Sequence, residues 1–396
     1  MRMMFVIGHL GDYHVPRYEA LKILAERRGD EIFLVEIFGR SGVYAFPQLT
    51  RDAFFDQSPP RAVTLEPDIT DAGGRWTSVA YKLAGIARAL RPDVVVTLGY
   101  HTPYSLWLYL LRQTAGTFRL IYMSDSKLDD GVRNRFKERL KRALVCRFDG
   151  ALVAGERHRA YAQTLGIPLE RSRVGFDVID VDRFARLAES ARASESETRR
   201  RYALPARYVL CVSRFVPRKK VDIVVDAYAR SELAAQGISL VLVGQGPDAD
   251  AIEKRVSSMR LKKNVRFLDP IPNAQMPAVY ALCDFMVLGS EFDQWGLCVN
   301  EAFAASKTAI VTQTCGAAGE LLKDGVNGFV VKAGDADALA QKMHTLASNA
   351  VLRESLSQRA RQSVEKWSPS MFAANLMELA DRLLCSERRV FSSVKR

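Results

Sequence analysis

Two carboxylates lie eight positions apart in the segment SEFDQWGLCVNEAFA, residues 290–304. Asp293 precedes Gly296, and Glu301 follows that glycine on what reads as a helix. A helix that begins at the glycine leaves its first amides without partners inside the helix, and such amides bind phosphate together with the helix dipole. These amides belong to about Gly296, Leu297 and Cys298. The carboxylates on either side are suited to accept hydrogen bonds from vicinal hydroxyls.

Two cations come earlier in the segment SRFVPRKKVD, after the short apolar run YVLCV. Arg214 lies at the end of the predicted strand, and Lys219 follows a turn that contains a proline. Cations at the carboxyl end of a parallel strand point towards its ligand side, and a guanidinium with an ammonium suits a diphosphate. A basic surface loop is the alternative interpretation. Combined with the carboxylates, the pattern favours a ligand with phosphate between two polyols, which describes a nucleotide-sugar.

Two other motifs were weighed as cofactor or metal sites. The segment VGQGPDA, residues 243–249, fits the G-x-G-x-x-A dinucleotide pattern, with Asp269 about 20 residues later. Pro247 stiffens the turn, and the motif follows the second predicted strand of its domain instead of the first, which disfavours a nicotinamide enzyme. The D-x-D sequence at 180–182 is more typical of a solvated turn than of a metal site. We therefore expect neither a bound cofactor nor a metal.

Composition indicates a globular protein of two domains. The chain has 396 residues, 48% hydrophobic and 26% charged, and its six cysteines are scattered without a CxxC pair. Scattered cysteines favour reduced thiols in the cytoplasm. The apolar run at the N-terminus is too short for a signal peptide, and no stretch reaches the roughly 20 residues of a membrane span.

The net charge of +12 favours anionic partners. Basic residues concentrate in RNRFKERLKRALVCRF, residues 133–148, where a helix would place Phe136, Leu140 and Leu144 on one face. An ordinary surface helix that packs by this apolar stripe is one interpretation. A membrane-surface or phosphate-steering patch over 133–147 is the other. Nucleic-acid binding is disfavoured because aromatic residues do not alternate with the basic ones and no nucleic-acid motif is present.

Short β-branched runs alternate with helical patterns along the whole chain, which predicts an α/β protein. Apolar strands such as DVVVTLG and SLVLVG, joined by helices, indicate parallel sheets covered on both faces. We predict two doubly wound, Rossmann-like domains, over 1–185 and 200–368, that face each other across a cleft. The polar segment 188–201 marks the boundary between them. An amphipathic helix over 369–386 ends the fold.

With these features the chain resembles a glycosyltransferase of family 4, with the two-domain GT-B fold. The resemblance rests on the order and spacing of five motifs: VSRFVPRKKVD, LVLVGQGPD, VRFLDPIP, VYALCDFMVLGSEFDQWGLCVNEAFAA and GAAGELLKDGVNGFVV. It implies that Arg214 and Lys219 bind the donor diphosphate and that Glu301 holds the ribose hydroxyls. It also implies that the first acid of the pair binds hydroxyls of the transferred sugar. That acid is Asp293 here, where the family has Glu, so the identity of the sugar stays open.

The remaining predicted donor residues are Leu268, Gln294 and Trp295, together with Gly11 in the first loop of the first domain. For the acceptor, the same loop offers His14 and Arg17, although helix-capping and surface roles are equally compatible with their positions. Asp125 follows the strand RLIYMS and is our candidate for contacting the sugar or the acceptor hydroxyl. His101 is a second candidate. Either residue is also typical of a turn.

The resemblance implies a retaining, metal-independent transfer of a sugar to an acceptor hydroxyl. We assign catalytic roles to Asp125, Asp293, Arg214 and Lys219. The departing phosphate would take the acceptor proton, and the last helix would cross back to the first domain. The acceptor stays open between a glycan, a lipid-linked molecule and a small molecule. The alternatives are a sugar-nucleotide epimerase or phosphorylase on the same fold, and a non-catalytic protein that binds sugar-nucleotides.

Overall fold

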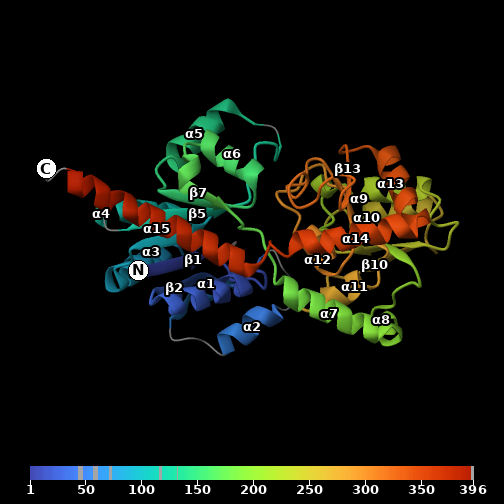
Figure 1. Cartoon of the computed structure of the whole chain (residues 1–396), viewed down its shortest axis with the longest axis horizontal. Helices are drawn as coiled ribbons and strands as arrows, with labels where there is room; N and C mark the ends of the chain where they lie inside the picture. Colours follow the sequence, from blue (N-terminus) through green and yellow to red (C-terminus); the bar gives the residue numbers. More distant parts are fainter. Residues whose placement is uncertain (43–47, 57–60, 71–73, 116–117, 132, 394–396) are drawn as a thin grey trace. The chain divides into compact units, whose positions relative to one another are not determined.

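The computed structural model describes the whole chain except residues 43–47, 57–60, 71–73, 116–117, 132 and 394–396, and the side chains of residues 386–393 lie outside the description. The chain divides into two compact units (Figure 1). Unit 1 comprises residues 1–128, 133–178 and 369–393. Unit 2 comprises residues 129–131 and 179–368.

Unit 1 is built on a parallel sheet of seven strands in the order β3-β2-β1-β4-β5-β6-β7. The central strands are apolar on both faces, since Val94, Val95 and Val96 are all fully buried. The strands are β1 (Arg2–Ile7), β2 (Glu31–Arg40), β3 (Ala62–Thr70), β4 (Val94–Leu98), β5 (Arg119–Ser124), β6 (Gly150–Val153) and β7 (Ser172–Val174).

Helices cover both faces of this sheet. The long C-terminal helix packs on α1 and on β5, β6 and β7, and α3 packs on α4. Since crossovers between parallel strands are right-handed, α3 to α6 lie on the face opposite to α1. The helices are α1 (His14–Arg28), α2 (Leu49–Asp56), α3 (Trp76–Leu90), α4 (Pro103–Ala115), α5 (Arg135–Val145), α6 (Glu156–Thr164) and α15 (Pro369–Ser393), with the short 3-10 turn η1 (Leu169–Arg171) before β7.

Unit 2 repeats the design with a parallel sheet of six strands in the order β10-β9-β8-β11-β12-β13. The strands are β8 (Tyr208–Val212), β9 (Ser239–Val243), β10 (Val265–Leu268), β11 (Phe285–Leu288), β12 (Ala309–Thr312) and β13 (Gly328–Val331). The helices are α7 (Val181–Ala193), α8 (Glu195–Tyr202), α9 (Val221–Arg230), α10 (Ala249–Ser258), α11 (Met276–Ala281), α12 (Leu297–Ala304), α13 (Ala336–Ser348) and α14 (Ala350–Val364), with the 3-10 turn η2 (Pro217–Lys219) after β8.

These two parallel sheets confirm the predicted fold class of two Rossmann-like α/β domains. The polar segment 188–201 is helical: it contains the end of α7 and almost all of α8, within unit 2. Its Arg and Glu side chains pair along the helix, as in the Arg199–Glu195 ion pair of 2.7 Å. Low apolar content therefore marks a solvated helical surface here.

The glycines of VGQGPDA have a structural explanation. Gly244 and Gly246 have φ angles of 147° and 155°, and a Cβ atom on either would lie 1.9 Å from the carbonyl oxygen of Ser213 or 2.3 Å from that of Phe215. The loop after β9 thus lies directly against the loop after β8, and only glycine allows this approach. The motif serves loop packing, which agrees with the sequence features that disfavour a nicotinamide enzyme.

Candidate functional site

The predicted helix start is observed at the carboxyl end of the sheet of unit 2. Gly296 has a left-handed φ of 91° and is the N-cap of α12, which begins at Leu297. A Cβ atom at this position would lie 2.8 Å from Sγ of Cys315, so the turn requires glycine. The first amides of α12 have no carbonyl one turn earlier in the helix. The structure therefore contains the glycine-capped helix start that the sequence predicts, and phosphate binding there stays a prediction.

Lys219 and Asp293 are brought together from the loops after β8 and β11. They form an ion pair in which Lys219 Nζ contacts Asp293 Oδ2, and the Asp293 residue is 6% exposed. The backbone of Asp293 is fixed on both sides, since its N–H donates to Thr314 and its carbonyl accepts from Gly316 at 3.0 Å. The sequence pattern predicts separate ligands for these two side chains, the diphosphate for Lys219 and the sugar for Asp293. The structure joins them into one charged pair.

Arg214 differs from its neighbours. Its side chain is exposed, and it makes no hydrogen bond or ion pair with the part of the chain that the structure describes. Arg218, which the sequence analysis did not single out, donates to Gln294 Oε1 at 2.8 Å and lies 5.3 Å from the ring centre of Phe292. Lys220 pairs with the exposed Glu291 at 3.6 Å. The run PRKK could have indicated Arg218. Its three successive cations follow β8 and therefore lie at the carboxyl edge of the sheet.

Glu301 lies one turn into α12 and is 2% exposed. Its Oε2 accepts a hydrogen bond of 2.8 Å from the hydroxyl of Tyr280 on α11. Sequence reasoning missed Tyr280, and nothing near it in the sequence links it to Glu301. Cys298 lies beside these acids, and burial raises the pKa of its thiol well above the usual range, with Asp293 adding to the shift. This thiol therefore stays protonated.

Trp295 and Leu268 have packing roles. The indole of Trp295 is buried, donates to Asn300 Oδ1 at 2.8 Å and packs on Trp367 with ring centres 4.6 Å apart. Leu268 ends β10, and its carbonyl accepts from the Gly244 amide at 3.1 Å. Their predicted donor contacts are untested, and their observed contacts shape the loops around Gly296.

In unit 1, the predicted acceptor residues lie in α1 and in the loops after β4 and β5. His14 begins α1, where its N–H donates to the Gly11 carbonyl at 2.8 Å, and burial and then the charge of Arg17 lower its pKa. Asp125 is half-buried directly after β5, and His101 is exposed after β4. Partial burial and then Lys141 lower the pKa of His101.

Arg17 is not placed for direct contact with an acceptor. It is 2% exposed, and its guanidinium donates twice to the Val178 carbonyl, at 2.9 and 3.1 Å. It also lies 3.5 Å from Asp177 and 5.0 Å from the ring centre of Phe176. Its burial argues against the predicted acceptor role, because α1 uses this side chain to hold the segment that ends unit 1.

A buried cluster around Glu36 of β2, level with the last residue of β1, was also missed by sequence reasoning. Glu36 is fully buried and accepts from Arg51 at 2.8 and 3.0 Å, from Thr64 at 2.6 Å and from the Leu10 amide at 2.9 Å. We call these four residues the Glu36 cluster. The Arg51 amide also donates to Asp12 at 3.1 Å. The cluster ties the first loop of unit 1 to β2, β3 and α2.

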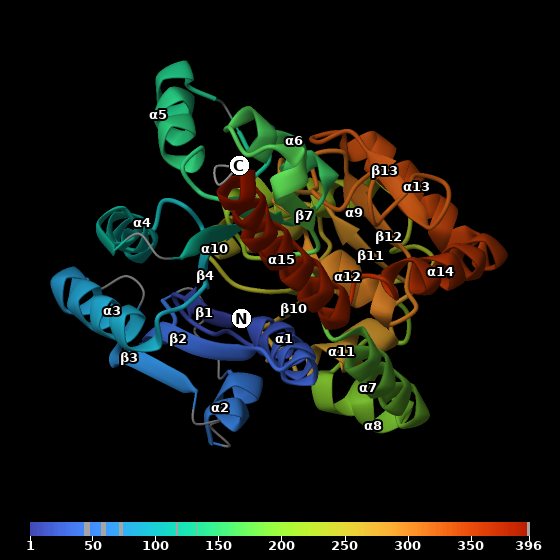
Figure 2. The same cartoon turned by 60° about the vertical axis from the view of Figure 1, so that its left-hand side comes forward.

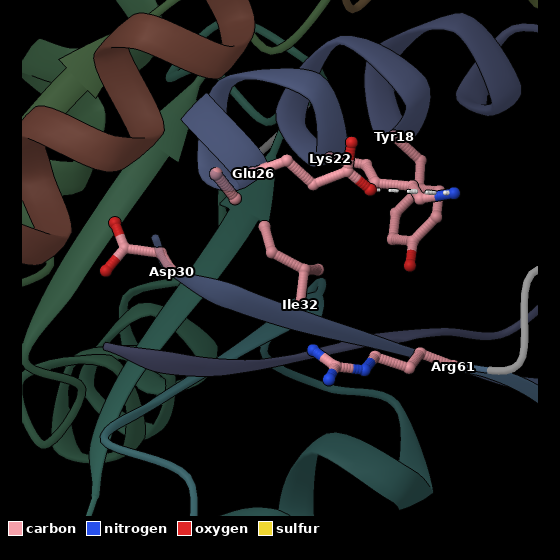
Figure 3. A pocket seen from close by; sticks show the side chains of 7 residues that line it. Tyr18, Lys22, Glu26, Asp30, Ile32 and Arg61 are labelled. Carbon is pink, nitrogen blue, oxygen red and sulfur yellow. Dashed lines mark ion pairs between the residues drawn. The ribbon is translucent and has the colours of Figure 1, made fainter. Parts of the chain in front are cut away.

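Among the described residues, no group of three or more His, Cys, Asp or Glu side chains could hold a metal ion. A pocket of about 180 Å³ lies between α1 and β2 and contains none of the predicted site residues (Figure 3). Its charged groups are engaged within unit 1, as in the Lys22–Glu26 pair of 3.9 Å and the bond of 2.7 Å from the Met1 amino group to Asp30.

Comparison with known proteins finds a family-model match within unit 2. Residues 194–363 match the family model described as glycosyl transferases group 1. The chain is 29% identical over 210 residues to a GDP-mannose-dependent alpha-(1-6)-phosphatidylinositol monomannoside mannosyltransferase of Mycolicibacterium smegmatis, covering 51% of this chain and 54% of that protein. It is 25% identical over 296 residues to an N-acetyl-alpha-D-glucosaminyl L-malate synthase of Bacillus anthracis, covering 72% and 74%. The chain spans about half the length of the curated relatives that it matches first.

The fold is shared with solved glycosyltransferases over nearly the whole chain. A glycosyltransferase of Rickettsia africae superposes with a TM-score of 0.76 at 16% identity and covers 97% of this chain and 98% of its own. The Anabaena protein HepE in complex with UDP-glucose gives 0.72 at 17% identity, with 97% and 100% covered. At this identity the likeness establishes the GT-B type of fold.

Proposed function

We propose that this chain is a retaining, metal-independent glycosyltransferase that moves a sugar from a nucleotide-diphosphate-sugar to an acceptor hydroxyl. The observation that carries the proposal is the carboxyl edge of the sheet of unit 2. The loop after β8 carries Arg214 and Lys219 there, Lys219 pairs with Asp293 of the loop after β11, and Glu301 follows one turn into α12. A diphosphate needs several positive partners, and a ribose and a hexose each need acceptors for their hydroxyls. This edge carries both kinds of group, the cations with the helix amides and the two carboxylates.

Each of these residues binds a different part of the donor. Arg214, unpartnered and exposed, is available for the phosphates, and Lys219 extends between them and Asp293. Glu301 accepts hydroxyls of the nucleoside ribose while Tyr280 holds its other oxygen in place. Asp293 receives the sugar hydroxyls with its charge balanced by Lys219. This balance lowers the cost of keeping a carboxylate nearly buried when no ligand is present.

The reaction then depends on stabilising the leaving group. Cleavage of the sugar–phosphate bond builds negative charge on the nucleoside diphosphate, and preorganised donors stabilise such charge best. Each charge-assisted hydrogen bond contributes about 1.5–3 kcal/mol, so two cations and the helix amides together make a large contribution. The acceptor oxygen bonds to the anomeric carbon on the face that the phosphate leaves, and that phosphate takes the acceptor proton. This route uses no separate protein base, and Asp125 is our candidate for contacting the sugar or the acceptor hydroxyl.

The comparisons support the class of donor but leave its base and sugar open. The mycobacterial relative is named for GDP-mannose and HepE was solved with UDP-glucose, so both nucleotides belong in the test. The acceptor is a glycan, a lipid-linked molecule or a small molecule. His14 and His101, at the carboxyl edge of unit 1, are the remaining candidates for contacting it.

Titration calorimetry with UDP and GDP on a Glu301→Gln variant tests the proposal. The substitution keeps the shape of the side chain and the bond from Tyr280 but removes the charge that binds two hydroxyls, so we expect about a 100-fold loss of affinity, from two bonds of ~1.5 kcal/mol each. Glu291→Gln is the matched control, because Glu291 is 60% exposed and ten residues away. Equal affinity in Glu301→Gln and the unmodified protein would refute the donor-site assignment.

A second measurement addresses the chemistry. Proton NMR of the anomeric signal after incubation with a sugar donor that carries the tighter-binding nucleotide should show the configuration retained, and excess EDTA should leave the rate unchanged. Inversion at the anomeric carbon, or a rate restored only by Mn²⁺ or Mg²⁺, would contradict the mechanism while leaving the nucleotide site intact.

A further inference from the structure

Two of the three residues of the predicted apolar stripe of α5 face solvent, whereas the third, Leu144, is half-buried against the core of unit 1. Phe136 is 71% exposed and Leu140 is 63% exposed, and Ala143 continues the stripe at helical spacing. The interpretation of α5 as an ordinary surface helix that packs by this stripe is wrong for Phe136 and Leu140. Two large apolar side chains on one outward helix face cost free energy in water unless another surface covers them.

The outward orientation is fixed by polar contacts on the inner side of α5. Glu138 accepts a hydrogen bond of 2.7 Å from the hydroxyl of Tyr161 on α6 and one of 2.8 Å from Lys141. Arg133 lies over the Tyr161 ring, 4.6 Å from its centre, and Val145 is buried at the end of the helix. Rotating α5 to bury Phe136 would break this network, so the helix is built with its polar side inward.

Cations flank the exposed stripe, and no acid of α5 lies on that face. The exposed basic side chains of the helix are Arg135, Lys137, Arg139 and Arg142. Glu138, the acid of the helix, is on the inner side. A helix with an apolar centre and basic flanks is complementary to an anionic lipid surface, where apolar groups enter the headgroup region and cations meet phosphates.

The neighbouring helices extend this surface. On α4, Trp107 and Leu110 are 39% and 48% exposed, and with Tyr81 of α3 they line an apolar groove of about 350 Å³. Arg112 of α4 donates to the Arg147 carbonyl at 2.8 Å, which joins α4 to the chain that leaves α5. The three helices lie along the same side of unit 1 (Figure 2). No described helix is both long and apolar enough to cross a bilayer.

We propose that α5, with α3 and α4 beside it, docks unit 1 on the surface of an anionic lipid bilayer. The helix lies in the plane of the interface: Phe136 and Leu140 insert between headgroups, and Lys137, Arg139 and Arg142 contact lipid phosphates. The proposal does not depend on the chemistry of unit 2, because it concerns binding without donor or acceptor. A test on vesicles therefore fails or succeeds independently of nucleotide binding.

Co-sedimentation with phosphatidylcholine vesicles and with vesicles of 70% phosphatidylcholine and 30% phosphatidylglycerol tests it. The full chain should bind the anionic vesicles at least tenfold more tightly than the neutral ones. Phe136→Ser/Leu140→Ser should lower that affinity at least tenfold. The control Ile23→Ser/Val351→Ser removes two other exposed apolar side chains, of 49% and 82% exposure, and should bind as the unmodified chain does.

Charge is tested separately. Lys137→Gln/Arg139→Gln/Arg142→Gln should lose the preference for anionic vesicles and the dependence of binding on salt. All variants should melt at the temperature of the unmodified chain, because the altered side chains are exposed. Absence of vesicle binding, or binding that Phe136→Ser/Leu140→Ser leaves unchanged, would overturn the proposal and point to a protein partner for this face.

Discussion

The carboxyl edges of the two sheets carry the same kinds of charged side chain and use them differently. In unit 1, the fully buried carboxylate of Glu36 receives four hydrogen bonds, two of them from Arg51. In unit 2, Asp293 is paired with Lys219, while Arg214 stays exposed and unpartnered among the described residues. At the edge of unit 1 the charged side chains of this cluster pair with each other and hold the loops together. At the edge of unit 2 the Arg214 guanidinium is available to a ligand.

The difference shows which charged residues should matter for stability and which should matter for ligand binding. A buried carboxylate is tolerable only when its partners are complete, and removing one partner leaves an uncompensated charge. An exposed guanidinium costs little without a partner, because water solvates it, and it remains available to an anion. Stability should therefore depend on Arg51 and nucleotide affinity on Arg214.

The largest expected effect comes from Arg51→Met. The substitution keeps an apolar stem in place but leaves Glu36 buried with half of its hydrogen bonds, so we expect a loss of about 3–5 kcal/mol in the free energy of unfolding of unit 1. Urea unfolding followed by circular dichroism measures this loss. Nucleotide affinity of the folded fraction should not change.

Arg61→Met is the matched control. Arg61 pairs with Glu31 at 3.0 Å, but both side chains are about half exposed. Exposed pairs contribute about 0–1 kcal/mol. If Arg51→Met were as mild as Arg61→Met, the Glu36 cluster would not be a structural element and the comparison between the two edges would fail.

The next effect is on binding. Arg214→Ala removes one charge-assisted interaction with phosphate, of about 1.5–3 kcal/mol, so the affinity for UDP or GDP should fall by about 10- to 100-fold. Calorimetry at fixed salt gives this number. The unfolding free energy should stay within ~0.5 kcal/mol of the unmodified value, as for other surface substitutions.

Arg266→Ala provides the comparison, since Arg266 is exposed on β10 of the same unit. It should leave both affinity and stability unchanged. A loss of stability in Arg214→Ala without a loss of nucleotide affinity would reverse the roles that we assign to the two edges.

Features that depend on neighbours in sequence were predictable. Apolar runs predicted the strands, and a glycine before the LCVNEAFA pattern predicted the start of α12 one residue from its observed position. The loop that carries Lys219 was predicted from its place after β8. These features follow from backbone conformation and strand order, which local patterns encode.

Features that depend on distant contacts were not predictable. Arg17 reads as a surface cation on a helix, but its partner, Val178, is 161 residues away. The apolar stripe of α5 reads as a packing face, but Phe136 and Leu140 are exposed, and Glu138 is held inward by its contact with Tyr161. The ion pair of Lys219 with Asp293 joins residues 74 positions apart. Periodicity identifies the faces of a helix but not which face meets its neighbours.

The smallest expected effect is on the pH dependence of stability, through His14 of unit 1. Burial and then the charge of Arg17 hold the pKa of His14 well below the usual value, and Arg17 lies 3.3 Å from its Nδ1. The folded chain therefore binds fewer protons at His14 than the unfolded chain does. The contribution of neutral His14 to stability is complete above the unfolded pKa of about 6.5 and is lost as the pH falls below it, by at most about 1.4 kcal/mol per pH unit.

His14→Asn should remove this part of the pH dependence. The stability difference between the unmodified chain and the variant should shrink by about 1 kcal/mol between pH 7.5 and pH 5.5, at a slope no steeper than one proton allows. NMR titration of the His14 ring gives the pKa directly, and UDP should not move it if His14 serves only the loop of unit 1. Parallel stability curves would contradict the role of burial and Arg17. A pKa that shifts with UDP would instead indicate that His14 senses the donor. The edge of unit 1 would then take part in binding as well as in stability.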